Sequence, residues 1–304
     1  MPNEVPKKRT MHLSAITDEI SQDFEHALDV LLEYGAEGAE LRGLWNVNIA
    51  DLSDEQAQKA KKALQARGLK VAALATPFFK CDLEPAAGAE AAGPLHLAPP
   101  RDFAQQMQIL ERCARLAHLF ETPYLRVFTF WKRGPYTDEV EDRIANAFEQ
   151  PLQLAQREGL TLVLENEHAC YVGTGAEAAH LAARINHSHF RICWDPGNAF
   201  AGGERPYPDG YEAVRPWIAH MHVKDARMVS TEHHGLQPRW CVMGQGEIDY
   251  DGQFAALRRD GYQGFVSLET HFVPETGTGP DGKGTHEDGS RACLEYLRRY
   301  FHVS

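Results

Sequence analysis

Short apolar runs alternate with longer amphipathic segments from end to end of the chain. The runs have the length of buried β-strands, and the segments between them repeat apolar positions every three to four residues, as helices do. The predicted strands are 11–16, 38–41, 71–75, 124–128, 162–165, 190–194, 218–225 and 265–268. The predicted helices are 22–34, 55–67, 102–120, 138–157, 176–185, 211–217, 250–259 and 287–300. This alternation predicts an α/β fold, a single (β/α)8 TIM barrel.

Two segments depart from the pattern. Residues 1–10 form a polar N-terminal tail, so the barrel is expected over 11–304. Residues 81–100 are rich in Ala, Gly and Pro, and a connection of this length is typical of a lid or an insertion loop. A doubly wound open sheet is the alternative fold, but the Gly-rich nucleotide signature of that fold is missing after the first strand.

Composition narrows the classes of partner. The net charge of -12 argues against a nucleic-acid surface, which needs a basic face. No run approaches the roughly 18 apolar residues of a membrane span. The six cysteines form no C-x-x-C pair and no secretory leader precedes them, so we expect reduced thiols and a cytoplasmic location. A small-molecule substrate is the expected partner, and a homo-oligomer stays open.

The strand predicted at 218–225 reads Ile-Ala-His-Met-His-Val-Lys-Asp. Side chains alternate along a strand, so His220, His222 and Lys224 share one face. Three other predicted strands each end in a carboxylate, and these are Glu165, Asp195 and Glu269. Function in a TIM barrel lies at the C-terminal ends of the strands. The pattern therefore predicts one metal site formed by Glu165, Asp195, His222 and Glu269.

This ligand set favours particular metals and a particular chemistry. One imidazole and three carboxylates suit Mn²⁺ or Mg²⁺, with Zn²⁺ or Co²⁺ as alternatives. Such an ion polarises a substrate carbonyl and makes the neighbouring C–H bond acidic. Glu165 and Glu269 could then remove and return that proton from opposite sides, as an isomerase or epimerase requires.

Neighbouring polar residues have simpler expected roles. His220 lies one layer deeper than His222 and is expected to be a hydrogen-bonded core histidine. Glu40, Arg42 and Arg126 are expected to form an ion-pair network at the barrel mouth.

Five motifs together resemble the sugar phosphate isomerase/epimerase family, within the xylose isomerase-like TIM barrel superfamily. They are Leu-Glu-Asn-Glu-His (164–168), Trp-Asp-Pro-Gly-Asn (194–198), His-Met-His-Val-Lys-Asp (220–225), Gly-Gln-Gly-Glu-Ile-Asp (244–249) and Ser-Leu-Glu-Thr-His (267–271). The resemblance implies that Glu165, Asp195, His222 and Glu269 bind one divalent metal ion. It also implies that Glu165 and Glu269 transfer protons, as in the ketose 3-epimerases.

The resemblance further suggests residues that contact substrate. Asn198 stands where relatives have a substrate-contacting histidine, which puts a specific epimerase activity in doubt. The other candidate substrate contacts are His168, Lys224, Arg227 and His271.

Three other functions compete with a sugar isomerase or epimerase. A lyase of the inosose dehydratase kind begins with the same proton abstraction. An endonuclease IV-type DNA-repair nuclease needs further histidines, and this chain has Asn198 and Trp240-Cys241 at such positions. A non-catalytic carbohydrate-binding or structural barrel has no need of paired carboxylates on a metal. Because no Gly-rich phosphate cradle is evident, a neutral sugar or keto-sugar is favoured over a sugar phosphate.

Overall fold

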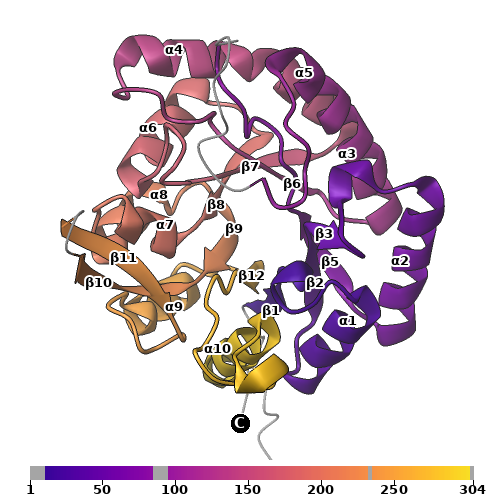
Figure 1. Cartoon of the computed structure of the whole chain (residues 1–304). Coiled ribbons are helices and arrows are strands. Elements are labelled where there is room, and N and C mark those ends of the chain that lie inside the picture. The colour runs from indigo at the N-terminus through magenta and orange to yellow at the C-terminus, as the bar shows by residue number, and fades with distance from the viewer. Residues whose placement is uncertain (1–10, 85–94, 232–234, 302–304) are drawn as a thin grey trace, which may run out of the picture.

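The computed structural model describes residues 11–84, 95–231 and 235–301, so the predicted N-terminal tail lies outside the described residues. Its centre is an eight-stranded parallel sheet (Figure 1). The strands are β1 (His12–Ala15), β2 (Gly38–Leu41), β5 (Lys70–Leu74), β6 (Tyr124–Val127), β7 (Thr161–Glu165), β8 (Phe190–Trp194), β9 (Ile218–Val223) and β12 (Phe265–Leu268). From β2 onward each strand pairs with the next in this order, and β12 pairs with β1. A parallel bridge between Ile16 and Glu40 joins β1 to β2 and closes the ring, which confirms the predicted TIM barrel.

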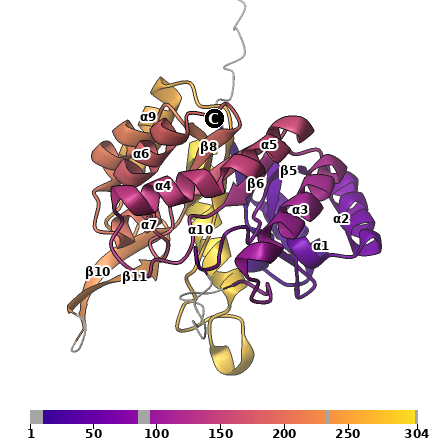
Figure 2. The same cartoon turned by 90° about the horizontal axis from the view of Figure 1, so that it is seen from above.

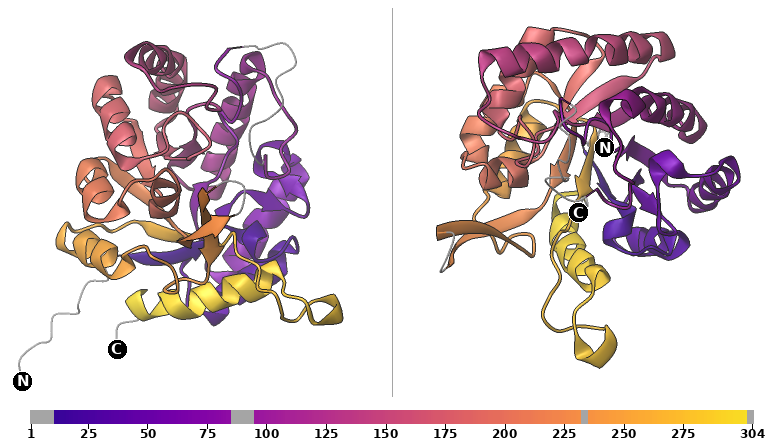
Figure 3. Two further views of the ribbon diagram at one scale, coloured as in Figure 1. Left: turned by 60° about the vertical axis from the view of Figure 1, so that its left-hand side comes forward. Right: turned by 45° about the horizontal axis from the view of Figure 1, so that its top comes forward.

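Helices surround the strands, as the two views of Figure 3 show. They are α1 (Phe24–Glu33), α2 (Asp54–Arg67), α3 (Gln106–Phe120), α4 (Asp138–Ala147), α5 (Glu149–Glu158), α6 (Gly175–Ile185), α7 (Pro196–Ala201), α8 (Tyr211–Val214), α9 (Tyr250–Arg259) and α10 (His286–Phe301). Single turns occur at Thr17–Glu19, Ile49–Asp51, Phe103–Gln105, Pro206–Gly210 and Pro280–Gly282. No helix in the described part of the chain is long and apolar enough to cross a membrane.

Local sequence sets where the helices begin and end. Ser53 caps α2 by accepting from the backbone N–H of Gln56, whose side chain accepts from the N–H of Ser53 in return. Gly68 ends α2 with a φ of 67°, a left-handed conformation that costs glycine nothing. Thr174 and Glu177 make the same reciprocal cap at α6. These caps fix the helices that bracket each strand.

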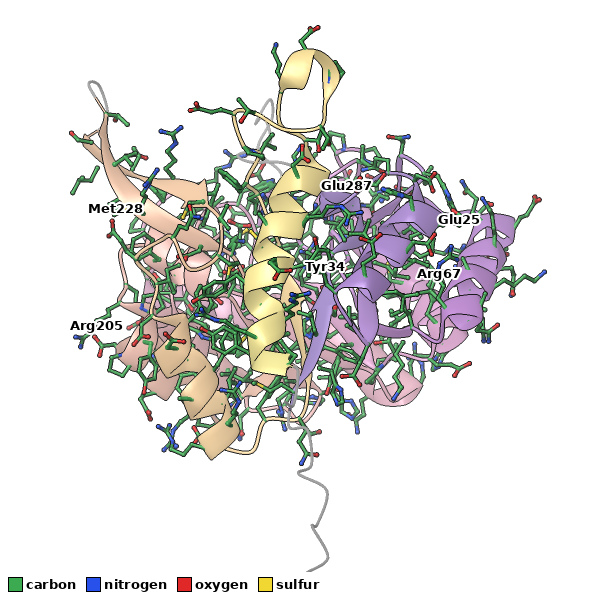
Figure 4. All side chains as sticks on the ribbon, turned by 90° about the horizontal axis from the view of Figure 1, so that it is seen from below. Glu25, Tyr34, Arg67, Arg205, Met228 and Glu287 are labelled. Carbon is green, nitrogen blue, oxygen red and sulfur yellow. The ribbon has the colours of Figure 1, made fainter. Side chains whose placement is uncertain are left out.

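The last helix returns to the first. His26 on α1 lies 2.8 Å from Glu287 on α10, and Arg291 on α10 pairs with Glu33 on α1. Figure 4, seen from below, marks Glu287 on α10 and Tyr34, the residue that follows α1. The layer of helices is therefore continuous where the two ends of the barrel meet.

The helix predicted over 138–157 is wrong in one respect, because the structure has two helices there. α4 ends at Ala147 and α5 begins at Glu149, with the fully buried Phe148 at the junction. Pro151 has no N–H to donate to the Ala147 carbonyl, so an uninterrupted helix would lose a hydrogen bond at this point.

A β-hairpin follows β9 where a loop was expected. β10 (Asp225–Thr231) and β11 (Gly235–Cys241) pair antiparallel. The hairpin extends from the barrel on the same side as the loop before α10 (Figure 2), and Figure 4 marks Met228 on it. A second small hairpin joins β3 (Gly43–Leu44) to β4 (Val47–Asn48).

The segment predicted as a lid or insertion is described only at 81–84 and 95–100. Asn48 Nδ2 on β4 donates to the His96 carbonyl at 3.0 Å, and Leu97 packs near Gly43. The described end of the segment therefore lies against the loop that follows β2, and its role as a lid stays a prediction.

Candidate metal centre

The structure brings the four predicted metal ligands together. Glu165 is the last residue of β7, Asp195 follows β8 directly, His222 lies on β9 and Glu269 follows β12 directly. One ligand atom from each residue lies within 4.8 Å of those from the other three, and all four side chains are buried. Four separate strands thus deliver one imidazole and three carboxylates to a single point.

The donor atoms fit a divalent metal ion. His222 Nδ1 is buried, lies 3.4 Å from Glu165 Oε1 and has no hydrogen-bond partner among the described residues. A buried polar atom without a partner loses the hydrogen bond that water would give it, so its retention needs a cause. A cation at the meeting point of the carboxylates would supply one, and the set of oxygen and imidazole donors suits Mn²⁺ or Mg²⁺.

Two protein cations reach the same carboxylates. Lys224 Nζ lies 2.8 Å from Asp195 Oδ2 and 2.5 Å from Glu269 Oε2. Arg126 Nη1 lies 3.1 Å from Glu165 Oε2. Because buried charges need opposite charges nearby, these pairs stabilise the carboxylates when no ion is present.

A third cation, Arg42, also reaches Glu269 but forms ion pairs with two other carboxylates. Arg42 donates to Glu269 Oε1 at 3.0 Å, but it also pairs with Asp18 at 3.0 Å and Glu19 at 2.5 Å. The three ligand carboxylates therefore face two largely uncommitted cations, Lys224 and Arg126.

Two of the ligand carboxylates are held in the ionised form. Burial raises the pKa of Glu269, but Lys224 and His271 outweigh it and hold that pKa well below its usual range. Burial and Glu269 raise the pKa of Glu165, while Arg126 and His222 lower it, and the net direction is downward. Both glutamates are thus charged at neutral pH, as metal ligands must be.

The other two ligands shift upward. Burial raises the pKa of Asp195 despite the neighbouring Lys224. Burial lowers the pKa of His222, yet Cys193, Glu40 and Glu165 raise it well above the ordinary value. A proton would therefore compete with a metal ion for His222, since only a neutral imidazole nitrogen binds a metal.

Asn198 joins two of the ligands. It lies in the first turn of α7, where the side chain of Asp195 accepts from its N–H at 3.0 Å. Its Nδ2 donates to Glu165 Oε1 at 3.1 Å and to Asp195 Oδ2 at 3.2 Å, and the residue is only 1% exposed. The side-chain amide of Asn198 therefore donates its hydrogen bonds to two candidate metal ligands. The predicted contact of Asn198 with substrate stays a prediction.

His168 lies beyond Asn198 and is partly exposed. Its Nδ1 lies 3.1 Å from Asn198 Oδ1 and 3.1 Å from Glu167 Oε1. The hydrogen bond to Glu167 raises the pKa of His168 above its ordinary value. Lys80 Nζ, 3.7 Å from Glu167 Oε2, completes this chain of polar contacts away from the metal ligands. Sequence reasoning missed Glu167 and Lys80, although Glu167 lies inside a motif that was singled out.

The remaining predicted substrate contacts differ in position. His271 Nε2 lies 3.4 Å from Glu269 Oε1, and the rings of His271 and Trp240 are 5.9 Å apart. The Lys224 ammonium lies 5.4 Å from the centre of the same tryptophan ring. Arg227 is exposed on β10 and shares no hydrogen bond or ion pair with the ligand cluster among the described residues. The structure therefore brings His271 and Lys224 to the ligand cluster and leaves Arg227 apart.

Glu40 was expected in an ion-pair network with Arg42 and Arg126, and this expectation is wrong. Its carboxylate instead contacts His220 Nε2 at 2.7 Å and His222 Nε2 at 2.9 Å, and all three side chains are fully buried. His220 is a core histidine as expected, although its Nδ1 has no partner among the described residues. The alternation of 218–223 signalled that both histidines share a face, but not what they face.

Fold and site together define a TIM barrel with a candidate divalent-metal centre at the C-terminal ends of its strands. Residues 28–300 match the family model described as xylose isomerase-like TIM barrel. The chain therefore belongs to the xylose isomerase-like TIM barrel family.

Individual relatives have low sequence identity to this chain. An inosose dehydratase from Bacillus licheniformis is 28% identical over 156 residues, which are 48% of this chain and 52% of that protein. The match thus spans about half the length of this curated relative. Among solved structures, the probable 3-DHS dehydratase AsbF from Bacillus anthracis has a TM-score of 0.69 at 20% identity, covering 94% of this chain and 98% of that one. A D-allulose 3-epimerase from Methylomonas sp., solved with D-allulose, also has a TM-score of 0.69, at 16% identity, covering 96% and 97%. These structural likenesses show the fold alone.

Proposed function

We propose that this protein is a divalent-metal-dependent enzyme that removes a proton next to the carbonyl of a neutral polyhydroxylated ketone. The observation that carries the proposal is the convergence of Glu165, Asp195, His222 and Glu269 within 4.8 Å, in buried surroundings. A Mn²⁺ or Mg²⁺ ion bound there would supply the Lewis acid that polarises the carbonyl. The same residues bind the ion and exclude water from the reacting centre.

Loss of water is the outcome that we favour after proton removal. An imidazole with a raised pKa, His168, lies one side chain away from the ligand cluster, and it is joined to that cluster through Asn198. Its Nε2 is not used in these contacts and can protonate a leaving hydroxyl. In this step the carboxylate of Glu165 or Glu269 takes the proton as the C–H bond breaks, and a C=C bond forms as the C–O bond breaks. The leaving hydroxide combines with the proton from His168 to give water. The likeness to an inosose dehydratase supports this choice and suggests a cyclic keto-polyol as substrate.

Isomerisation or epimerisation is the second candidate. Glu165 and Glu269 come from different parts of the ring of strands and both reach the ligand cluster. A pair of this kind can take a proton from one side of a carbon and return it on the other. Both carboxylates are ionised and held by cations, however, so at neutral pH the second one carries no proton to return to the substrate. This is why dehydration ranks first.

A labelled-solvent experiment separates the two reactions. The Mn²⁺-loaded protein would be incubated with an inosose, or with a keto-sugar, in D₂O, and the products read by mass spectrometry. A dehydratase gives a product lighter by one water, whereas an isomerase or epimerase gives a product of unchanged formula with deuterium on carbon. No loss of water and no deuterium uptake from any neutral polyhydroxylated ketone tested would contradict the proposal.

The variant His168→Asn sharpens the assignment. Asn keeps a hydrogen-bonding side chain but has no proton to give, so we expect water loss to fall by about 100-fold or more, within the range for a lost general acid. Deuterium uptake into substrate should persist because proton removal does not need His168. His118→Asn is a matched control, since His118 is an exposed histidine paired with Glu158 on the helical layer. Equal losses of water elimination and deuterium uptake would contradict the role of His168.

A further inference from the structure

The carboxylate of Glu40 joins two histidines in the layer beneath the ligand cluster. Glu40 Oε1 lies 2.9 Å from His222 Nε2, and Glu40 Oε2 lies 2.7 Å from His220 Nε2. All three side chains are completely buried, so water cannot replace either contact. Ser267 Oγ, 3.4 Å from His220 Nε2 and 2.7 Å from Ser14 Oγ, closes the far side of the group.

This arrangement determines which nitrogen of His222 is free. An ionised carboxylate only accepts hydrogen bonds, so each Nε2 must carry a proton. Nδ1 is then the one nitrogen of His222 that can bind a metal, and it is also the atom without a hydrogen-bond partner. It lies 3.4 Å from Glu165 Oε1, which belongs to the ligand cluster. The hydrogen bond from His222 Nε2 to Glu40 thus directs the lone pair of His222 Nδ1 toward the ligand cluster.

The pairing of strands is irregular at two residues of this group, Glu40 and His220. The pairing of β2 with β5 shifts register between Ala39 and Leu41, at Glu40. The pairing of β8 with β9 shifts between Ile192 and Cys193, where Cys193 pairs with His220. Such irregularities redirect side chains and are frequent beside active sites. The two register shifts therefore coincide with the two residues of the Glu40–His220 contact.

We infer that Glu40 is a positioning residue, which holds His222 with its Nε2 protonated and its Nδ1 directed at the metal, with His220 as the second anchor of the same carboxylate. The inference rests on the proposed metal site. It gives Glu40 no contact with substrate, and it assigns His220 to the support of a metal ligand.

Glu40→Gln tests the inference with almost no change of volume. A glutamine has one acceptor oxygen for two Nε2–H groups, so one histidine must lose its bond or change tautomer. Loss of such an outer partner typically weakens metal binding by about 10- to 100-fold. The matched control is Glu141→Gln, because Glu141 is also a buried carboxylate that contacts a histidine, His180 at 2.7 Å, but lies on α4 outside the barrel.

Two readouts separate positioning from a merely structural role. The first is the Mn²⁺ dissociation constant from calorimetry, measured beside the melting temperature of the metal-free protein. The second is the count of buried histidine Nε2–H protons by ¹⁵N-edited NMR of the metal-free protein, with His220→Gln used for assignment. We expect Glu40→Gln to bind Mn²⁺ about 10- to 100-fold more weakly and to lose one of two such protons, and Glu141→Gln to match the wild type in both.

Each other result is decisive. Unchanged Mn²⁺ affinity in a folded Glu40→Gln variant would overturn the inference while leaving the metal site intact. A wild-type protein that binds no Mn²⁺ would overturn the proposed function together with the inference. If Glu40→Gln does not fold, Glu40→Asp takes its place, since its shorter side chain cannot reach both histidines. Affinity equal to that of the wild type would then overturn the inference.

Discussion

The barrel interior has two polar layers that balance buried carboxylates in different ways. At the mouth, Glu269 and Asp195 are paired with the Lys224 ammonium at 2.5 and 2.8 Å. One layer below, Glu40 is paired with the N–H groups of His220 and His222. A single ammonium on a flexible stem can be displaced by a metal ion, whereas two ring N–H groups fix an orientation. The upper layer is thus suited to exchange a cation, and the lower layer to hold a ligand in place.

The largest effect is expected from removing the ammonium at the mouth. Lys224→Met leaves Asp195 and Glu269 buried without their common partner, and breaking a buried pair costs about 3–5 kcal/mol. We expect the free energy of unfolding of the metal-free variant to fall by that order. Mn²⁺ should restore more stability to this variant than to the wild type, because the ion no longer competes with Lys224.

Urea denaturation with and without Mn²⁺ measures both quantities. Lys61→Met serves as control, since Lys61 pairs with the exposed Glu121 and such surface pairs contribute about 0–1 kcal/mol. A variant of Lys224 that gains no more from Mn²⁺ than the wild type would show that the ammonium and the ion do not share these oxygens.

The next effect concerns a ligand itself. Asp195→Asn removes a charged ligand but keeps a residue that caps the start of α7 well. We expect the protein to fold and its Mn²⁺ affinity to fall by more than the about 100-fold that an outer partner accounts for. Calorimetric titration against a chelator of known affinity gives the value. If Asp195→Asn lost less Mn²⁺ affinity than Glu40→Gln, Asp195 would not be a metal ligand with Glu40 as the outer partner.

The pH dependence of Mn²⁺ binding tests whether His222, the residue that joins the two layers, is a metal ligand. Protonated His222 cannot bind an ion, and Cys193, Glu40 and Glu165 overcome burial to hold its pKa well above the ordinary value. Apparent Mn²⁺ affinity should therefore be low in acid and rise as the pH increases toward that pKa, by up to about tenfold per unit. Calorimetry in buffers of different ionisation enthalpy should show protons released on binding. Affinity that does not change with pH would exclude His222 as a ligand.

The smallest effect is expected at the edge of the lower layer. Ser267→Ala removes the 2.7 Å hydrogen bond to Ser14 and the 3.4 Å contact to His220 Nε2, but leaves both contacts of Glu40. We expect a loss of about 1 kcal/mol in the free energy of unfolding and no change in Mn²⁺ affinity. A weaker metal affinity in this variant would show that the serine pair, too, positions His222.

The barrel and the convergence of four candidate ligands were predictable because each depends on a short repeating signal. Apolar runs marked the strands, and a carboxylate or imidazole at the end of a run marked Glu165, Asp195, His222 and Glu269. The hairpin of β10 and β11 was not predicted, since its strands carry a proline and mixed polarity. A two-stranded ribbon with exposed edges tolerates both features.

The contacts of Glu40 could not be read from the sequence for a different reason. They join residues 180 and 182 positions apart across the barrel, through strands whose register shifts at that point. A charged residue near a strand end indicates the mouth of a barrel, but not which neighbour it meets. The sequence pattern located the four candidate ligands, whereas the contacts of Glu40 became visible only in the closed ring of strands.

The most direct measurement is anomalous diffraction from a crystal grown with Mn²⁺. We expect one peak at the C-terminal ends of the strands, with Glu165, Asp195, His222 through Nδ1, and Glu269 as its protein ligands. A crystal without a peak at this position, or an ion there that His222 does not contact, would contradict a metal centre built by these four residues.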